Sequence, residues 1–212
     1  MGVHENKLEN VARMDNAQLW NLFINGEIEA WEEIFTLFYE DLYGYGLKLS
    51  EQPELTKDSI HELFVELWER RDHLSKAISV KAYLLASLRR KLLRKIKRKR
   101  KYKVGLEGKE EEIKNGIQFS PEEIIIEKEN RNSELTALYG ALQCLPDRQK
   151  EVLYLKYFNG MSYDEMEEIL GINYQSIRNH VYRAMKRLRD MLNQDVSKMA
   201  ISILLVLTIY LF

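Results

Sequence analysis

Apolar side chains recur at three- and four-residue steps along most of this chain, and this spacing is the strongest constraint on its fold. The pattern is clearest between residues 15 and 49, where it comprises Leu19, Leu22, Phe23, Trp31, Ile34, Phe35, Phe38, Leu42, Tyr45 and Leu49. Such a period places a stripe of side chains on one face of an α-helix. Only 3 prolines and 10 glycines occur among 212 residues, so few positions interrupt helices. We therefore predict an all-α protein.

The same pattern predicts two small helical domains, a helical bundle over residues 16–101 and a second domain over residues 133–194. The remaining stripes of the bundle are Ile60, Leu63, Phe64, Leu67 and Trp68, and then Val80, Leu84, Leu88, Leu92 and Ile96. Residues 102–132 lose this periodicity and contain three glycines, which favours a flexible linker. Near its end, Ser120 and Pro121 precede two glutamates and predict a helix start. A polar extension (1–15) and an apolar tail (195–212) complete the chain.

The net charge of −1 conceals a strong separation of charges. Residues 89–103 contain eleven Lys or Arg and no acid, whereas residues 27–72 contain thirteen Asp or Glu against four Lys or Arg. This asymmetry indicates two different partners, one polyanionic and one basic. Solvated helix faces are the alternative, and they suffice for the acidic stretch. They account less well for the basic one, because concentrated positive charge repels itself in the absence of an anion.

A short helix followed by a longer basic one is predicted at the end of the second domain. Ser162 and Glu165 have the spacing of a capping box, Gly171 suits a tight turn, and Asn173 suits the cap of the next helix. The apolar face of that last helix consists of Ile177, Val181, Ala184 and Leu188. Two helices joined in this way form a helix-turn-helix. Spacing alone leaves an ordinary helical hairpin with a solvated basic face as an equal alternative.

The opposite face of this last helix carries amide and basic side chains that suit DNA recognition. An α-helix fits the major groove, where Arg binds guanine and Gln or Asn binds adenine. Residues near the start of such a helix usually reach the bases, which assigns base readout to Gln175, Ser176, Arg178 and Asn179. Later basic residues favour phosphates, which assigns backbone contacts to Arg183, Lys186 and Arg187.

Residues 145–192 resemble the C-terminal, −35-element-binding domain of sigma-70 family transcription factors. The LP-x-R-Q-x-E-V-L opening, the G-x-S-Y-x-E hairpin, the LGI turn and the R-A-x-x-R-L ending all match. The resemblance implies a factor that brings RNA polymerase to promoters. The family usually has a small alanine at the position of Glu167. We therefore expect this glutamate to point to a rim or to hold the two helices slightly apart.

Residues 58–68, DSIHELFVELW, resemble the sigma segment that docks on the clamp helices of the polymerase β′ subunit. The resemblance implies polymerase contacts by Asp58, His61, Glu62 and Glu66. The three acids occur at four-residue steps, which suits a basic partner, and helix solubility is the alternative. His61 stands where the family favours glutamine, and its charge would depend on pH near neutrality.

Residues 83–101 correspond to the −10-element segment of the family but depart from its pattern. Arg90 replaces the usual asparagine and Arg94 the usual aspartate, so base-specific readout is not carried over. We expect instead a basic helix that attracts DNA phosphates largely without sequence preference. Its candidate contact residues are Arg89, Arg90, Arg94, Lys97 and Arg98.

The lack of a sizeable middle domain matches the extracytoplasmic-function (ECF) group of the family. The resemblance then implies three partners, namely core RNA polymerase through its β′ clamp helices and β flap, promoter DNA, and an anti-sigma factor. The single cysteine, Cys144, rules out an internal disulfide and fits a cytoplasmic location, and we expect no cofactor or metal. In that group the linker runs near the RNA exit path, where the acidic 107–129 stretch is a candidate mimic of nucleic acid. A stand-alone helix-turn-helix regulator and a membrane-tethered adaptor are the alternatives.

The tail over residues 199–212 is uncharged and strongly apolar. As a helix it would extend about 21 Å, short of the ~30 Å hydrocarbon core of a bilayer. Three interpretations compete: packing on the chain's own core, a surface for an anti-sigma factor or other partner, and a shallow membrane contact. We favour the first two. An enzyme is not expected, because the four histidines lack metal-ligand spacing and Cys144 has no nearby base in the sequence.

Overall fold

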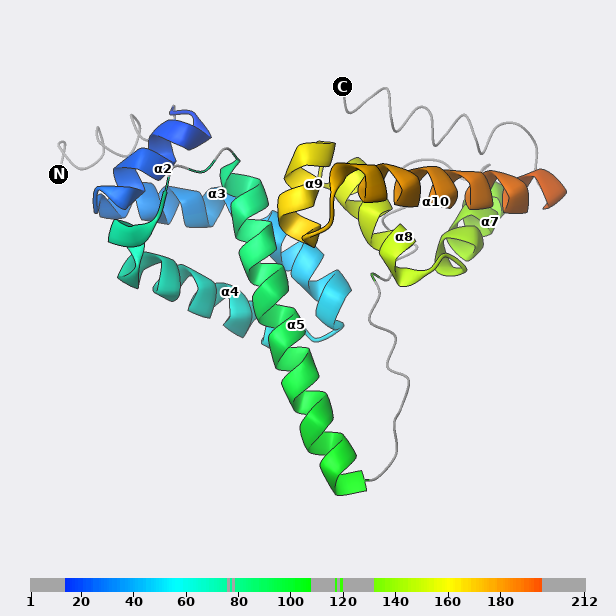
Figure 1. The fold of residues 1–212 in the computed structure, drawn as a ribbon, viewed down its shortest axis with the longest axis horizontal. Coiled ribbons are helices and arrows are strands. Elements are labelled where there is room, and N and C mark those ends of the chain that lie inside the picture. Colours follow the sequence, from blue (N-terminus) through cyan, green and yellow to red (C-terminus); the bar gives the residue numbers. More distant parts are fainter. Residues whose placement is uncertain are drawn as a thin grey trace. The chain divides into compact units, whose positions relative to one another are not determined.

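A computed structural model of the chain describes residues 14–75, 77, 79–107, 117, 119 and 132–195. Every regular element within these ranges is a helix, which confirms the predicted fold class. The chain divides into two compact units, residues 1–111 (unit 1) and residues 112–212 (unit 2), whose helices are labelled in Figure 1. The helix start predicted at Ser120 and the apolar tail lie outside the described residues.

Unit 1 consists of α2 (Asn16–Ile24), α3 (Ile28–Ser50), α4 (Pro53–Glu69), a 3-10 turn η1 (Arg71–His73) and α5 (Val80–Glu107). The side chain of Asp15 caps α2 by accepting the backbone N–H of Gln18 at 2.8 Å. The backbone of Gly26 has a φ of 90°, a conformation that glycine adopts readily, so the apolar pattern of residues 15–49 is divided into two helices. Pro53 occupies the first turn of α4, where its missing N–H costs no hydrogen bond.

The long helices of unit 1 approach closely at Gly46 of α3. A Cβ atom at this position would lie 2.8 Å from Cγ2 of Thr56 on α4. It would also lie 3.2 Å and 3.3 Å from the side chains of Leu92 and Leu88 on α5. The largest fully buried side chains of unit 1 are Trp20, Tyr45, Phe23, Phe64, Leu19, Leu42, Ile60, Leu84, Leu85, Leu88 and Leu92. Most of the predicted apolar stripes therefore form one core, which requires a glycine where α3 meets its neighbours.

Unit 2 contains α7 (Asn132–Gln143), α8 (Asp147–Leu153), a π-helical turn η2 (Tyr154–Phe158), α9 (Tyr163–Leu170) and α10 (Tyr174–Asp195). Helix α8 begins directly after Pro146. Its core is formed by apolar side chains from these helices, including Leu138, Leu142, Leu145, Val152, Leu155, Met166, Ile169, Ile177, Val181, Ala184 and Leu188. The apolar face predicted for the last helix is therefore the face that packs on the rest of unit 2.

Two observations bear on the expected linker over residues 102–132. Helix α5 continues to Glu107, six residues beyond the expected end of the first domain at Lys101. Ile117 and Phe119, which fall in the middle of the expected linker, are buried. The expected domain limits stay predictions, but part of the sequence between them is helical and part is packed.

Candidate nucleic-acid interface

The turn between α9 and α10 is built by the residues that the sequence singles out. The hydroxyl of Ser162 accepts the N–H of Glu165 at 3.2 Å, and the Glu165 carboxylate accepts the N–H of Ser162 at 2.8 Å, which completes a capping box. Gly171 ends α9 with a φ of 64°, in the left-handed region that favours glycine. Asn173 then caps α10 by accepting the N–H of Ser176 at 2.8 Å. The predicted helix-turn-helix geometry is therefore present.

The exposed face of α10 carries most of the side chains assigned to DNA. Exposed are Gln175, Arg178, Asn179, Arg183, Lys186 and Arg187, whereas Ser176 is half-buried. Gln175 Nε2 donates to Asn179 Oδ1 at 3.3 Å, so these two amides orient each other. Tyr182, with 66% of its surface exposed, lies on the same helix among these polar residues. The residues assigned to base readout therefore lie together at the start of α10, and the basic side chains assigned to phosphates follow.

Arg187 differs from the other residues assigned to the DNA backbone. Its Nη1 atom donates to Oε1 of Gln149 on α8 at 3.5 Å, and Gln149 is buried. The guanidinium group therefore contacts the body of unit 2 as well as solvent. This contact has no local sequence signal, because the pairing depends on how α8 packs against α10.

Glu167 occupies the rim of the turn, one of the two placements expected for it. Its carboxylate accepts the backbone N–H of Tyr174, the first residue of α10. The starting residue of a helix lacks an intrahelical partner for its N–H, and a negative charge is favourable there because of the helix dipole. Together with Asn173, Glu167 fixes the start of the candidate recognition helix.

His180 lies on α10 next to positively charged side chains. Burial lowers the pKa of its imidazole below the ordinary value, and the charges of Arg148 and Arg183 act in the same direction. The imidazole is therefore held in its neutral form at neutral pH. Positive charge on this part of unit 2 comes from arginine and lysine rather than from His180.

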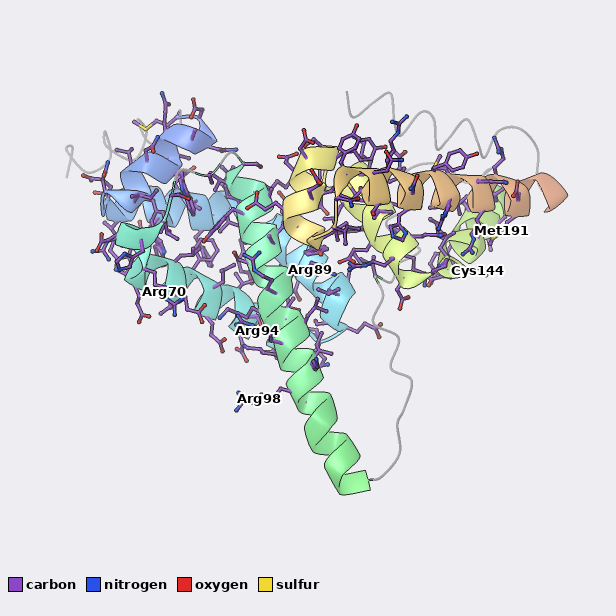
Figure 2. The ribbon with its side chains drawn as sticks, in the orientation of Figure 1. Arg70, Arg89, Arg94, Arg98, Cys144 and Met191 are labelled. Carbon is purple, nitrogen blue, oxygen red and sulfur yellow. The ribbon has the colours of Figure 1, made fainter. Side chains whose placement is uncertain are left out.

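The cations of α5 are sorted onto two sides of the helix. Four lysines make polar contacts with α3, α4 or the turn between them: Lys81 with Asp41, Lys91 with Glu62 and Glu66, Lys95 with Glu62, and Lys99 with Gln52. Of the residues assigned to DNA phosphates, Arg90, Arg94, Lys97 and Arg98 are exposed and Arg89 is half-buried. Figure 2 labels Arg89, Arg94 and Arg98 along this helix. The residues 90, 94, 97 and 98 share one helix face, which forms a basic stripe.

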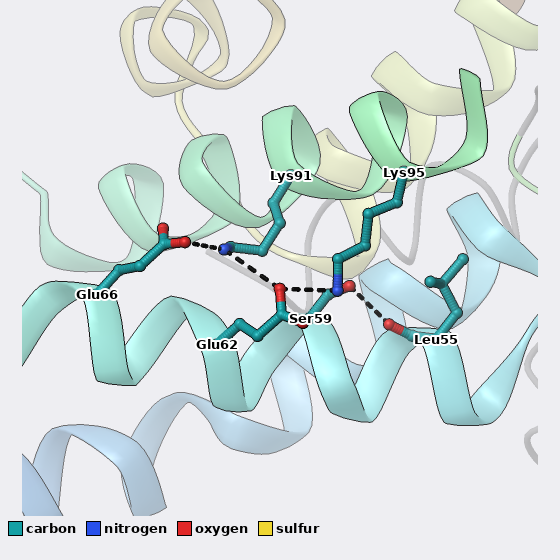
Figure 3. A network of polar contacts seen from close by, with 6 residues as sticks. All are labelled: Leu55, Ser59, Glu62, Glu66, Lys91 and Lys95. Atoms are coloured by element: carbon teal, nitrogen blue, oxygen red, sulfur yellow. Dashed lines mark hydrogen bonds and ion pairs between the residues drawn. The ribbon is translucent and has the colours of Figure 1, made fainter. Parts of the chain in front are cut away.

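Two of the acidic residues assigned to polymerase contacts, Glu62 and Glu66, pair with lysines of α5. Lys91 Nζ lies between Glu66 and Glu62, at 3.5 Å from Glu62 Oε2, and Lys95 Nζ lies 2.8 Å from the same oxygen (Figure 3). The hydrogen bond from Lys95 lowers the pKa of the Glu62 carboxyl, and the charge of Lys91 adds to this effect. Both carboxylates remain about half exposed, so they contact α5 on one side and solvent on the other. The matching four-residue spacing of Glu62 with Glu66 and of Lys91 with Lys95 was a sequence signal for this pairing.

Asp58 and His61, the other two residues assigned to polymerase contacts, are also exposed. The His61 ring stacks on Phe35 of α3, with ring centroids 6.2 Å apart and an angle of 27° between the rings. Phe35 belongs to a row of half-buried aromatic side chains along α3, formed by Trp31, Phe35, Tyr39 and Tyr43 with successive centroids 5.2–6.3 Å apart. The sequence placed Trp31 and Phe35 in the core. The structure leaves these rings partly accessible beside His61, so they are part of the candidate surface.

The described parts of the chain contain no helix that is both long and apolar enough to cross a bilayer. Within the same residues, no three His, Cys, Asp or Glu side chains are grouped in a way that would hold a metal ion.

A helix-turn-helix with a basic face in one unit, and a helical bundle with a basic stripe in the other, define a two-unit DNA-binding transcription protein. The family model for Sigma-70 region 2 matches residues 34–102, and the model for Sigma-70, region 4 matches residues 135–188. The chain belongs to the sigma-70 family of RNA polymerase sigma factors, in its ECF group. Members of this family bind core RNA polymerase and promoter DNA and direct transcription initiation, and they are not enzymes in the usual sense.

Curated relatives and a solved structure agree with this assignment. The ECF sigma factor SigM of Bacillus subtilis is 24% identical over 173 residues, which cover 78% of this chain and 97% of SigM. The sigma factor YlaC of the same organism is 23% identical and covers 74% of this chain and 89% of YlaC. The sigma factor RpoE of Bartonella quintana, solved with the anti-sigma factor NepR, has a similar fold with a TM-score of 0.56 at 21% identity. That comparison covers 77% of this chain and 97% of RpoE.

Proposed function

We propose that this chain directs core RNA polymerase to promoters, with unit 2 reading a −35 element through α10 and unit 1 engaging polymerase through α4. The observation that carries the proposal is the exposed amide and basic face of α10, which follows a turn fixed by Glu165, Gly171 and Asn173. An exposed helix of this composition suits the major groove. The proposed base-reading residues are Gln175, Ser176, Arg178 and Asn179, and the proposed phosphate contacts are Arg183, Lys186 and Arg187.

Unit 1 is proposed to contact the polymerase β′ clamp helices with Asp58, His61, Glu62 and Glu66. Asp58 and His61 are exposed, and Glu62 and Glu66 are half exposed, so all four side chains are accessible to a partner. The basic stripe on the other side of α5 supports attraction of DNA by Arg90, Arg94, Lys97 and Arg98, and the half-buried Arg89 is proposed to add to it. Neutralising phosphates in this way gives affinity that falls with salt and depends little on sequence.

An anti-sigma factor is proposed as a further partner, because RpoE of Bartonella quintana was solved with NepR. A cytoplasmic location follows from this role, since polymerase and chromosome are there. We further propose that unit 2 contacts the polymerase β flap and that the tail contacts a partner or a membrane. The tail lies outside the described residues, and its strongly apolar composition supports such a contact.

The decisive experiment is in-vitro transcription with purified bacterial core polymerase, from a promoter upstream of the gene, with and without this protein. We expect a start-site-specific transcript only when the protein is present. Asp58→Lys should lower core binding at least about tenfold, since it places a positive charge against a basic partner. Glu40→Lys makes the same charge change at an exposed position of α3 and serves as the control.

Glu62 is a poor choice for this test, because a lysine there would face Lys91 and Lys95 and disturb the bundle. A stand-alone regulator is the competing function. It would bind its DNA site tightly without polymerase and give no core-dependent transcript, and that pair of results would overturn the proposal.

A further inference from the structure

Phe119 packs against an aromatic pair of unit 2, although it lies in the sequence between the two domains. Its ring centroid lies 6.2 Å from that of Tyr154 and 5.5 Å from that of Phe158. Tyr154 and Phe158 stack on each other at 5.3 Å, with 11° between their rings, at the two ends of the π-helical turn η2. The Phe119 side chain is almost completely enclosed, with 2% of the residue exposed.

The backbone of the same residue is held as well. Gln143 Nε2, at the end of α7, donates to the Phe119 carbonyl oxygen at 2.9 Å. Ile117, two positions earlier, is fully buried. A ring contact, a side-chain-to-backbone hydrogen bond and a second buried apolar residue therefore fasten this segment. We call Ile117 and Phe119 the anchor.

The anchor shortens the segment that connects the two units. Helix α5 ends at Glu107 and α7 begins at Asn132, so residues 108–131 would be the connection if nothing between them were fastened. With the anchor in place, the connection is the nine residues 108–116. Whatever their conformation, ten Cα–Cα steps reach about 36 Å at most, compared with about 90 Å for the unanchored connection.

We propose that Phe119 is a positioning residue that sets how far unit 2 can lie from unit 1, and thereby which promoter spacings the factor accepts. This inference rests on the proposed function. The −10 and −35 elements are about 25 base pairs apart by their names, or roughly 85 Å at about 3.4 Å per base pair. The helices of the two units span part of this separation, so the anchored connection leaves far less slack than the unanchored one, whose reach exceeds the whole separation. A short connection discriminates between spacings because its effective concentration drops once the sites lie beyond its reach.

The test uses two insertions that lengthen the chain equally on opposite sides of the anchor. Gly-Ser-Gly-Ser is inserted after Glu111 in one variant and after Glu127 in the other. Transcription with core polymerase is measured on promoters whose spacer is lengthened one base pair at a time, and the readout is the ratio of long-spacer to optimal-spacer transcript. We expect the insertion after Glu111 to raise this ratio about fivefold and the insertion after Glu127 to leave it unchanged.

Releasing the anchor should have the same effect as lengthening the chain before it. Phe119→Ser should raise the long-spacer ratio and make the insertion after Glu127 effective as well. Phe119→Leu, which keeps an apolar side chain, should behave like the unmodified protein. Equal effects of the two insertions, or no effect of either, would overturn the proposal.

A distance measurement on the free protein separates this inference from the proposed function. Spin labels on A17C in unit 1 and D190C in unit 2, in a Cys144→Ser background, report the longest separation of the units. That separation should increase with the insertion after Glu111 and with Phe119→Ser, but not with the insertion after Glu127. If no transcript appears at any spacing, the proposed function is wrong, and the distance measurement still tests the role of the anchor. An unchanged separation in the Glu111 insertion and Phe119→Ser variants would refute that role.

Discussion

The Nζ atom of Lys91 on α5 donates to Oε1 of Glu66 on α4, although the two residues are 25 positions apart in the sequence. The Lys91 side chain is 6% exposed and that of Glu66 is 48% exposed. Glu62 supplies a second carboxylate to the same ammonium group at 3.5 Å. An ammonium group is tolerated in a bundle when carboxylates neutralise it. The contact joins the helix proposed to dock on polymerase to the helix proposed to attract DNA.

Removing both carboxylates should destabilise unit 1 far more than removing one. Glu66→Gln should lower the free energy of unfolding by about 1 kcal/mol, because Glu62 still neutralises Lys91. The double variant Glu62→Gln with Glu66→Gln should lower it by about 3 kcal/mol, because a buried positive charge is left unpaired. Urea unfolding followed by circular dichroism measures both values, with Glu69→Gln on the exposed side of α4 as the control. Equal losses in the single and double variants would contradict the shared role.

The Glu62 pair should make stability depend on pH in the acid range. The hydrogen bond from Lys95 holds the pKa of Glu62 below its ordinary value of 4.5, so the folded chain binds fewer protons than the unfolded chain. The stabilisation is therefore complete above pH 4.5 and is lost as the pH falls through the folded-state pKa. The carboxylate is half exposed, so solvent screening keeps the effect small. Thermal unfolding should show the unmodified protein more stable than Glu62→Gln at neutral pH, with the difference shrinking in acid; a constant difference would refute this.

Gly46 and Gly140 should respond in opposite ways to the same substitution. Gly46→Ala should cost about 1–3 kcal/mol, because the new Cβ would lie 2.8 Å from Thr56 Cγ2 and force the helices apart. Gly140→Ala has no atom within 4 Å of the new Cβ and lies within α7, so it should be neutral or stabilise by up to about 1 kcal/mol. Chemical denaturation of the two variants measures the difference. Similar changes in the free energy of unfolding at both positions would show that the close approach at Gly46 does not determine the effect of the substitution.

Substitutions along α10 should separate base contacts from phosphate contacts. Arg178→Ala should weaken binding to the promoter by about 1–3 kcal/mol and reduce the preference for it over unrelated DNA. Lys186→Ala should weaken binding to both DNAs equally and lower the slope of log affinity against log salt by about 0.9. Both the sequence preference and the salt slope are measured with polymerase-bound factor, in competition assays at a series of salt concentrations. The assignment is wrong if Lys186→Ala changes sequence preference while Arg178→Ala does not.

Glu167 should stabilise the start of the recognition helix through its acceptor oxygen. Glu167→Ala removes the partner of the Tyr174 N–H and should cost about 1 kcal/mol, in the range of a lost helix cap. Glu167→Gln keeps an acceptor and should recover most of that loss. Glu168→Ala, an exposed neighbour on α9, serves as the control. If the alanine and glutamine variants lose equal stability, charge rather than the hydrogen bond is responsible.

The fold was predictable from the sequence wherever local rules act within a few residues. The capping box at Ser162, the turn at Gly171 and the buried face from Ile177 to Leu188 depend on spacing alone, and all three are confirmed. The division of the first apolar stretch at Gly26 was missed, because its period continues across the break. Helical periodicity says where side chains point and gives little information about where one helix ends and the next begins.

The candidate sites were less predictable, because their details depend on packing between distant segments. Asp58 and His61 are exposed, which a docking surface requires. The contacts of Glu66 with Lys91, of Arg187 with Gln149 and of Phe119 with Tyr154 each join residues from different elements or loops. Pairings over 25–38 positions have no local signature, although equal spacing of opposite charges on two helices was a usable hint for the first.

The two sides of α5 differ in how their cations would respond to covalent modification. Acetylation of Lys91 or Lys95 would remove the charge that holds Glu62 and Glu66, so a lysine acetylase would act on the cohesion of the bundle. Methylation of Arg94 or Arg98 would keep the positive charge and block paired hydrogen bonds at exposed positions, without disturbing a helix contact described here. Modification of the lysines would therefore change the stability of the bundle. Modification of the arginines would instead change the affinity of α5 for nucleic acid.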